Sequence, residues 1–213
     1  MKQVQSDLWE TEVESPAPGL TTHAYLLIRD DGNVLFYNTG HGHELDRMAE
    51  LGGVAYHFLS HQDELGASIN TIRERFGAKL GGHVEEQEAF ARYCIPDILF
   101  KERQQVLSNV EAIPTPGHSP GSTCFLVRAR HGRTYLFTGD TLYLSKGGVW
   151  RAGLVPGYSD RDALIETLHL LREFEPDVVI SSAFNGDAGF QEITGGEWPQ
   201  YVDRALALLR HKS

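Results

Sequence analysis

Cysteine and clustered basic residues are scarce in this sequence. Only Cys94 and Cys124 occur among 213 residues, which excludes a disulfide-stapled scaffold and is usual in a reducing compartment. Asp and Glu number 29 against 19 Lys and Arg, a formal net charge of −10, and no run of basic residues occurs. We therefore expect no nucleic-acid partner, because affinity for a phosphate backbone comes mainly from clustered cations.

Long apolar runs are also missing. No stretch approaches the ~20 apolar residues of a membrane span, and the first residues contain no apolar signal core. We therefore expect a cytoplasmic protein with no membrane partner. What is present suits an ordinary globular chain, because 41% of the residues are hydrophobic and the length is sufficient for one domain with its own core.

A turn-rich stretch, TPGHSPGS at residues 115–122, contains His118. Apolar segments flank this stretch, which places His118 on a tight loop between two expected strands. A further apolar segment, residues 135–137, is followed at once by Thr-Gly-Asp ending at Asp140. A carboxylate and an imidazole at the ends of strands can converge on one rim of a sheet. Hydrolytic metal sites are built in this way from loops on a rigid scaffold.

The two stretches resemble motifs of the metallo-β-lactamase superfamily of hydrolases, in which each supplies one metal ligand. The interval from His118 to Asp140, 140 − 118 = 22 positions, suits that family. The resemblance extends over most of the chain. It implies an α+β fold, the four-layer αββα sandwich, in a single domain spanning residues 1–213 with β-rich halves at about 1–105 and 106–213.

Hydrophobic periodicity and turn residues predict the main elements of this fold. A hairpin is expected from strands at 22–28 and 34–37, ending at Asn38 where the family usually has Asp. The other expected elements are helices at 44–51, 69–76 and 84–92, strands at 54–59, 79–83 and 177–181, two short strands within 100–114, a helix opened by Ser159, and a closing helix around 202–209.

The family's first motif, H-x-H-x-D-H, aligns with His61 and the residues after it. His61 keeps the first ligand position, and Asp63 replaces the second histidine with a carboxylate. Leu65 and Gly66 take the third and fourth positions and cannot coordinate a metal. The final histidine of the family falls at Ala183, so a binuclear site of the usual type is not expected.

The remaining candidate ligands are His61, Asp63, His118 and Asp140. Two imidazoles and two carboxylates can hold one divalent ion, with zinc the first expectation and iron or manganese as alternatives. Glu64 is a candidate general base or a substitute ligand, and Asp63 is a ligand, a catalytic carboxylate or simply the N-cap of the following helix.

Three functions fit this set. The first is hydrolysis of a small-molecule substrate by a metal-bound hydroxide at a mononuclear site. The second is a catalytically inactive domain, metal-free or with a structural metal, that binds a ligand or partner in the old cleft. The third is iron-dependent oxygenation, because His61, His118 and Asp140 match a two-histidine, one-carboxylate set in number.

Several other residues are secondary candidates. His83 is the best substitute metal ligand, and His41 and His43 are weaker candidates for that role. Tyr143, Trp150 and Arg151 line either the pocket mouth or the edge of the core, and Arg151 is a candidate for binding an anionic substrate group. An apolar face on the last helix suggests a homodimer.

Overall fold

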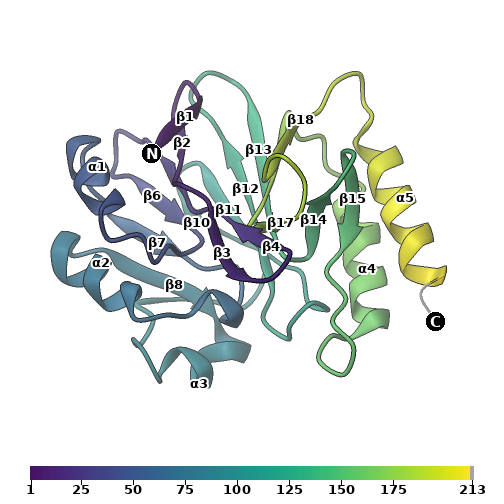
Figure 1. Ribbon diagram of the computed structural model, residues 1–213, viewed down its shortest axis with the longest axis horizontal. Helices are drawn as coiled ribbons and strands as arrows, with labels where there is room; N and C mark the ends of the chain where they lie inside the picture. Colours follow the sequence, from purple (N-terminus) through teal and green to yellow (C-terminus); the bar gives the residue numbers. More distant parts are fainter. Residues whose placement is uncertain (212–213) are drawn as a thin grey trace. The chain divides into compact units, whose positions relative to one another are not determined.

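The computed structural model describes residues 1–211, and the chain divides into two compact units, Met1–Lys101 and Glu102–Ser213 (Figure 1). No helix among the described residues combines the length and the apolar character that a membrane crossing requires.

The first unit contains a seven-stranded sheet in the order β1-β2-β5-β6-β7-β8-β9. Strands β1 to β6 pair antiparallel within this sheet, whereas β6 to β9 pair in parallel. The loops that follow parallel strands emerge at one edge of a sheet, so the residues after β6 and β7 lie at the same edge. The sheet strands are β1 (Lys2–Gln5), β2 (Leu8–Glu10), β5 (Tyr25–Leu27), β6 (Val34–Phe36), β7 (Tyr56–Phe58), β8 (Lys79–His83) and β9 (Ile98–Phe100).

The rest of the first unit is a separate hairpin and short helices. The hairpin is formed by β3 (Glu14–Ala17) and β4 (Leu20–Thr22). The helices are α1 (Glu44–Glu50), α2 (Ser68–Phe76) and α3 (Gln87–Phe90), and the 3-10 turns are η1 (Gln62–Glu64) and η2 (Val84–Glu86).

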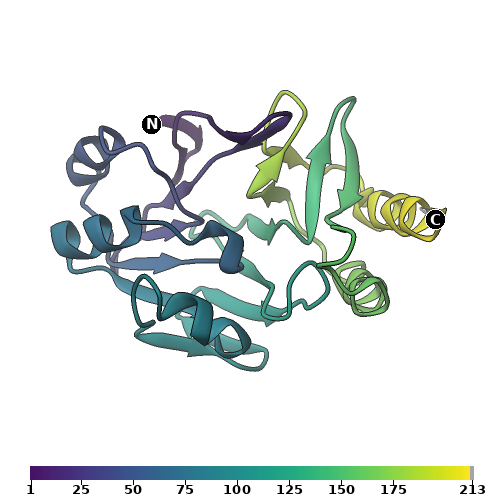
Figure 2. The same ribbon diagram turned by 60° about the horizontal axis from the view of Figure 1, so that its bottom comes forward.

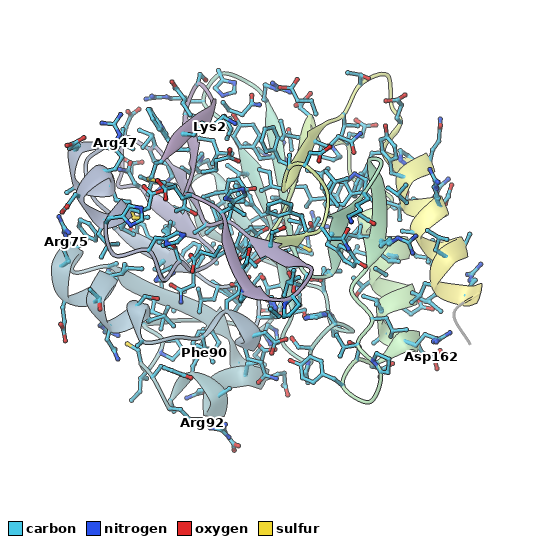
Figure 3. All side chains as sticks on the ribbon, viewed as in Figure 1. Lys2, Arg47, Arg75, Phe90, Arg92 and Asp162 are labelled. Carbon is cyan, nitrogen blue, oxygen red and sulfur yellow. The ribbon has the colours of Figure 1, made fainter. Side chains whose placement is uncertain are left out.

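Aromatic rings pack on both faces of β8. A Cβ at Gly81 would collide with the rings of Phe58 and Phe100, and a Cβ at Gly82 would collide with the ring of Phe90. Phe90 is fully buried, whereas Arg92, two residues further on, projects into solvent (Figure 3). The Gly-Gly pair in this strand therefore serves core packing, because any side chain there would displace a ring.

The second unit contains a six-stranded sheet in the order β10-β11-β12-β13-β16-β18, and beside it β15, β14 and β17 pair in that order. Strands β13 and β16 are parallel, so the chain leaves both of them at one edge. The strands are β10 (Gln104–Leu107), β11 (Val110–Pro114), β12 (Thr123–Arg128), β13 (Thr134–Gly139), β14 (Leu142–Ser145), β15 (Val149–Ala152), β16 (Val178–Ser181), β17 (Ala183–Phe184) and β18 (Phe190–Glu192).

Two helices, α4 (Arg161–Leu171) and α5 (Trp198–His211), lie side by side next to the β14–β15 hairpin (Figures 1 and 2). Their apolar residues join one buried cluster with Leu142, Leu144, Trp150 and Ala152 of the hairpin. The apolar face of α5 is therefore used by its own unit: Val202, Ala205, Leu206 and Leu209 are buried there. The face that suggested a homodimer is occupied, and the dimer itself stays a prediction.

Most of the predicted elements are present, among them the β5–β6 hairpin, α1, β8, and α2 with Gly77 in the left-handed conformation after it. The predicted start of α4 was wrong by one residue, because the N-cap is Asp160, whose carboxylate accepts the Ala163 N–H, and not Ser159. The expected helix over 84–92 is the turn η2 followed by the four-residue α3. Sequence patterns missed β1 to β4, β9, the β14–β15 hairpin, β17 and β18, which are all short.

Candidate metal centre

His61 follows β7 in extended conformation and is 2% exposed. Its Nδ1 lies 2.8 Å from Ser60 Oγ, and the Ser60 hydroxyl donates its only hydrogen to Glu64 Oε1 at 2.5 Å. Because that hydrogen is used, Nδ1 must be the donor in the contact with Ser60. The network thus assigns the tautomer in which Nε2 carries the lone pair, which is the form that binds a metal.

Glu64 has a buried carboxylate that contacts both Ser60 and His61. Its Oε2 accepts the Ser60 backbone N–H at 2.8 Å, and its Oε1 lies 3.3 Å from His61 Nδ1. A carboxylate behind a histidine orients the ring and raises its basicity as a metal ligand. These contacts are those of a positioning group, and the predicted role of Glu64 as base or ligand stays untested.

Asp63 lies in η1 with its side chain 50% exposed, and its Oδ2 is 3.9 Å from His61 Nε2. It does not cap the next helix, since the N-cap of α2 is Ala67 and no side chain bonds there. The capping alternative for Asp63 is therefore wrong, because η1 separates this residue from the helix start. The first unit places the imidazole of His61 beside the carboxylate of Asp63, and their role as metal ligands stays a prediction.

Leu65 and Gly66, which stand where the family has two ligands, carry the chain from η1 into α2. The Leu65 side chain packs against a buried apolar cluster with Leu59, Ile69, Leu80 and Phe90. Asn38, at the end of the β5–β6 hairpin, holds this turn: its Nδ2 donates to the Glu64 carbonyl at 2.9 Å, and its Oδ1 accepts the Ser68 hydroxyl at 3.0 Å. Asn38 thus anchors the loop behind His61.

His118 belongs to the second unit, where its side chain is almost wholly buried. Its Nδ1 lies 2.7 Å from the Gly153 carbonyl oxygen, an acceptor only, so Nδ1 carries the hydrogen and Nε2 carries the lone pair. The His118 carbonyl in turn accepts the Ser159 hydroxyl at 2.9 Å. Ser159 therefore fixes the His118 loop instead of capping α4, a role that its position next to the helix start concealed.

Asp140 completes the pair in the second unit. Its Oδ2 lies 3.9 Å from His118 Nε2, and its Oδ1 accepts the Ala183 N–H at 3.0 Å. Ala183 occupies the position of the family's final histidine. Its backbone thus holds a predicted ligand in place, although its side chain cannot bind a metal.

Gly153 allows its backbone to pack closely against Asp140 and His118. A Cβ there would overlap the Asp140 carbonyl oxygen and lie 3.0 Å from His118 Nδ1. Only glycine leaves room for its own carbonyl to reach the imidazole. The sequence analysis did not identify Gly153 as part of the site. Its one available signal was its position directly after an apolar segment.

The spare histidines have local partners. His83 Nδ1 accepts the Glu85 N–H as the cap of η2, His41 Nε2 lies 3.2 Å from the Val13 carbonyl, and His43 pairs with exposed Glu12 at 3.2 Å.

His57 is buried in β7 and donates from Nε2 to the Tyr37 carbonyl at 2.8 Å. Burial lowers the pKa of His57 to about 4, so the ring is neutral at pH 7.

Of the three residues expected at a pocket mouth, Trp150 belongs to the core. It is 1% exposed, packs edge-on against Trp198 and donates from Nε1 to Gln191 Oε1 at 2.8 Å. Tyr143 and Arg151 are half-buried. Strand alternation decides this difference, because neighbouring residues of β15 face opposite sides.

The family model described as "Metallo-beta-lactamase superfamily" matches residues 67–183. The match covers more than half of the chain, and it includes His118, Asp140 and Ala183 but begins after His61 and Asp63. The chain belongs to the metallo-β-lactamase superfamily, as its motifs indicated.

Similar proteins agree with this assignment. The "Probable metallo-hydrolase YqgX" of Bacillus subtilis (strain 168) is 24% identical over 176 residues, which is 72% of this chain and 80% of the relative. The metallo-β-lactamase from Pontibacter korlensis has a TM-score of 0.76 at 15% identity, covering 99% of this chain and 98% of that one. An archaeal superfamily protein from Sulfolobus tokodaii has a TM-score of 0.70 at 16% identity, covering 97% and 87%. These structures confirm the predicted α+β fold of metallo-β-lactamase type.

Proposed function

We propose that this protein is a metal-dependent hydrolase of a small-molecule substrate, with one divalent ion bound by His61, Asp63, His118 and Asp140. Zinc is the expected ion, with iron or manganese as alternatives. Membership of the superfamily and the similarity to a probable metallo-hydrolase support this class of activity.

The observation that carries the proposal occurs once in each unit. In both, a histidine Nε2 lies 3.9 Å from an aspartate Oδ2, and the Nδ1 of the same ring is taken up by a neighbouring oxygen. Two donors at ~2.1 Å from a tetrahedral zinc are about 3.4 Å apart, so each pair suits coordination after a small side-chain movement. Two imidazoles and two carboxylates are also a chemically suitable ligand set.

A bound divalent ion would supply a Lewis acid and lower the pKa of a coordinated water to ~7. The protein's own residues orient the ligands, through the Gly153 carbonyl at His118 and through Ser60 and Glu64 at His61. Asp63 is the residue that can accept a proton from water, because its carboxylate is half exposed, whereas the Glu64 carboxylate already accepts two hydrogen bonds from Ser60.

Metal content tests the proposal. Protein purified without added metal or chelator would be analysed by elemental mass spectrometry, together with His61→Ala, His118→Ala and Asp140→Asn. His169→Ala is the matched control, because His169 lies exposed on α4. We expect about one equivalent of zinc, iron or manganese in the wild type and the control, and a loss in the three variants.

A screen of esters, thioesters and lactams with the metal-loaded protein then tests hydrolysis. Protein that contains no metal and does not take up zinc, iron or manganese would refute the proposal. The protein would then be better studied as a domain that binds a ligand or partner.

A further inference from the structure

Arg151 differs from the other half-buried arginines in the described part of the chain. Seven arginines are partly buried, and six of them donate to a carboxylate or a carbonyl of the protein. No such partner engages the Arg151 guanidinium among the described residues. The six satisfied pairs are Arg29 with Gly32, Arg47 with Glu50, Arg73 with Asp97, Arg133 with Glu192, Arg161 with Leu209, and Arg172 with Asp203.

Strand alternation places Arg151 on the face of β15 away from α4 and α5. Its neighbours Trp150 and Ala152 are buried in the cluster that includes those helices, so the Arg151 side chain leaves from the opposite face. Tyr143 is the cross-strand partner of Arg151 and, by the same argument from Leu142 and Leu144, faces the same way. Directly opposed side chains of this kind have Cβ atoms about 5 Å apart.

Tyr143 and Arg151 lie level with Ala183, the residue whose backbone binds Asp140. Leu144 of β14 pairs in parallel with Phe184 of β17, so Tyr143 lies next to Ala183, whose N–H binds the Asp140 carboxylate. Neighbouring strands are ~4.8 Å apart. Tyr143 is therefore one strand and Arg151 two strands, about 10 Å, from the backbone that positions a candidate metal ligand.

We infer that Arg151 and Tyr143 form a subsite for a carboxylate of the substrate, which rests on the proposed hydrolase and specifies its substrate class. The planar guanidinium matches a carboxylate with two parallel hydrogen bonds, and the Tyr143 hydroxyl can donate a third. A single cation suits a carboxylate better than a phosphate dianion. The substrate is then a small carboxylic acid whose scissile group lies several bonds from the carboxylate.

A binding experiment on metal-free protein tests the subsite without hydrolysis. Isotope-labelled protein would be titrated with glutarate, with its neutral analogue glutaramide and with inorganic phosphate, and followed by NMR. We expect glutarate alone to shift the amide resonances of Tyr143 and Arg151, and Arg151→Gln to abolish the shift. Arg128→Gln is the matched control, because Arg128 is exposed and carries the same charge.

A kinetic experiment on zinc-loaded protein tests the specificity. The ratio of kcat/KM for p-nitrophenyl hydrogen glutarate to that for neutral p-nitrophenyl valerate should fall about 10- to 100-fold in Arg151→Gln and less in Tyr143→Phe. Arg151→Lys should retain part of the ratio, because lysine keeps the positive charge but lacks the planar guanidinium that makes two parallel hydrogen bonds. Thermal melting checks that each variant is folded.

Three results of the titration would overturn the subsite: no glutarate shift at these residues, a shift that persists in Arg151→Gln, or phosphate binding in place of glutarate. An equal effect of Arg151→Gln on both esters would also overturn it. If the wild type hydrolyses neither ester, the proposed hydrolysis of such esters fails, and the titration still decides whether the carboxylate subsite exists.

Discussion

His118 Nε2 and Asp140 Oδ2 lie 3.9 Å apart, and each side chain is held by a backbone group from a later segment of the chain. The Gly153 carbonyl accepts from the imidazole, and the Ala183 amide donates to the carboxylate. Neither partner needs a side chain for this role. The pair is thus oriented before any metal binds, which lowers the reorganisation that coordination would require.

Gly153→Ala is expected to be disruptive. The new Cβ would overlap the Asp140 carbonyl oxygen and press on His118 Nδ1. Overpacking of this kind costs about 2 kcal/mol or more, so we expect a lower free energy of unfolding by denaturant and weaker zinc binding. Gly42→Ala is the control, because its Cβ would meet nothing within 4 Å. Equal stability of the two variants would contradict this account.

Glu64→Gln should weaken metal binding while leaving the fold intact. Removing the negative charge behind His61 makes the imidazole a poorer ligand, and changes behind a metal ligand typically cost 10- to 100-fold in affinity. Competition with a zinc chelator measures this effect. The control is Glu74→Gln at an exposed position of α2. An unchanged zinc affinity in Glu64→Gln would show that the carboxylate does not act through His61.

Asn38→Asp, which restores the residue usual in the family, is expected to destabilise this protein. The Asn38 amide donates to the Glu64 carbonyl and accepts from Ser68, whereas a carboxylate can only accept. Losing the donor leaves two oxygens facing each other at a cost of about 1–3 kcal/mol. Chemical denaturation would measure the loss, and a more stable variant would show that the amide assignment is wrong.

Stability should fall at acidic pH through His57. Burial lowers the folded pKa to about 4, against ~6.5 in the unfolded chain. Between these values the unfolded chain binds more protons, so the free energy of unfolding decreases as pH falls from 6.5 to 4, by about 3 kcal/mol in total. Above pH 6.5 this group contributes no pH dependence.

Denaturation curves at several pH values, compared with His57→Gln, test this expectation. Glutamine can still donate to the Tyr37 carbonyl but does not titrate, so the variant should lack this part of the slope. A wild-type slope that survives in His57→Gln would assign the pH dependence to other groups.

Local patterns were sufficient for most of the scaffold. Helix α2 was visible from Ile69, Ile72 and the stop at Gly77, because a helix repeats its buried face every three to four residues. Short strands such as β14 and β15 were missed, because three or four residues hold too few alternations to show a pattern. Ser159 and Asp160 are both good capping residues, and only the three-dimensional path of the chain selected between them.

The sequence by itself determined the family, the strand-end positions of His118 and Asp140, and the type of donor that each offers. Only the tertiary structure decided which nitrogen of each imidazole carries the hydrogen, that Trp150 belongs to the core, and that Arg151 has no partner among the described residues. The physical reason is separation along the chain. Gly153 lies 35 residues from His118, and Ala183 lies 43 residues from Asp140. Both act through backbone atoms, so the glycine at position 153 is the one trace that these two contacts leave in the sequence.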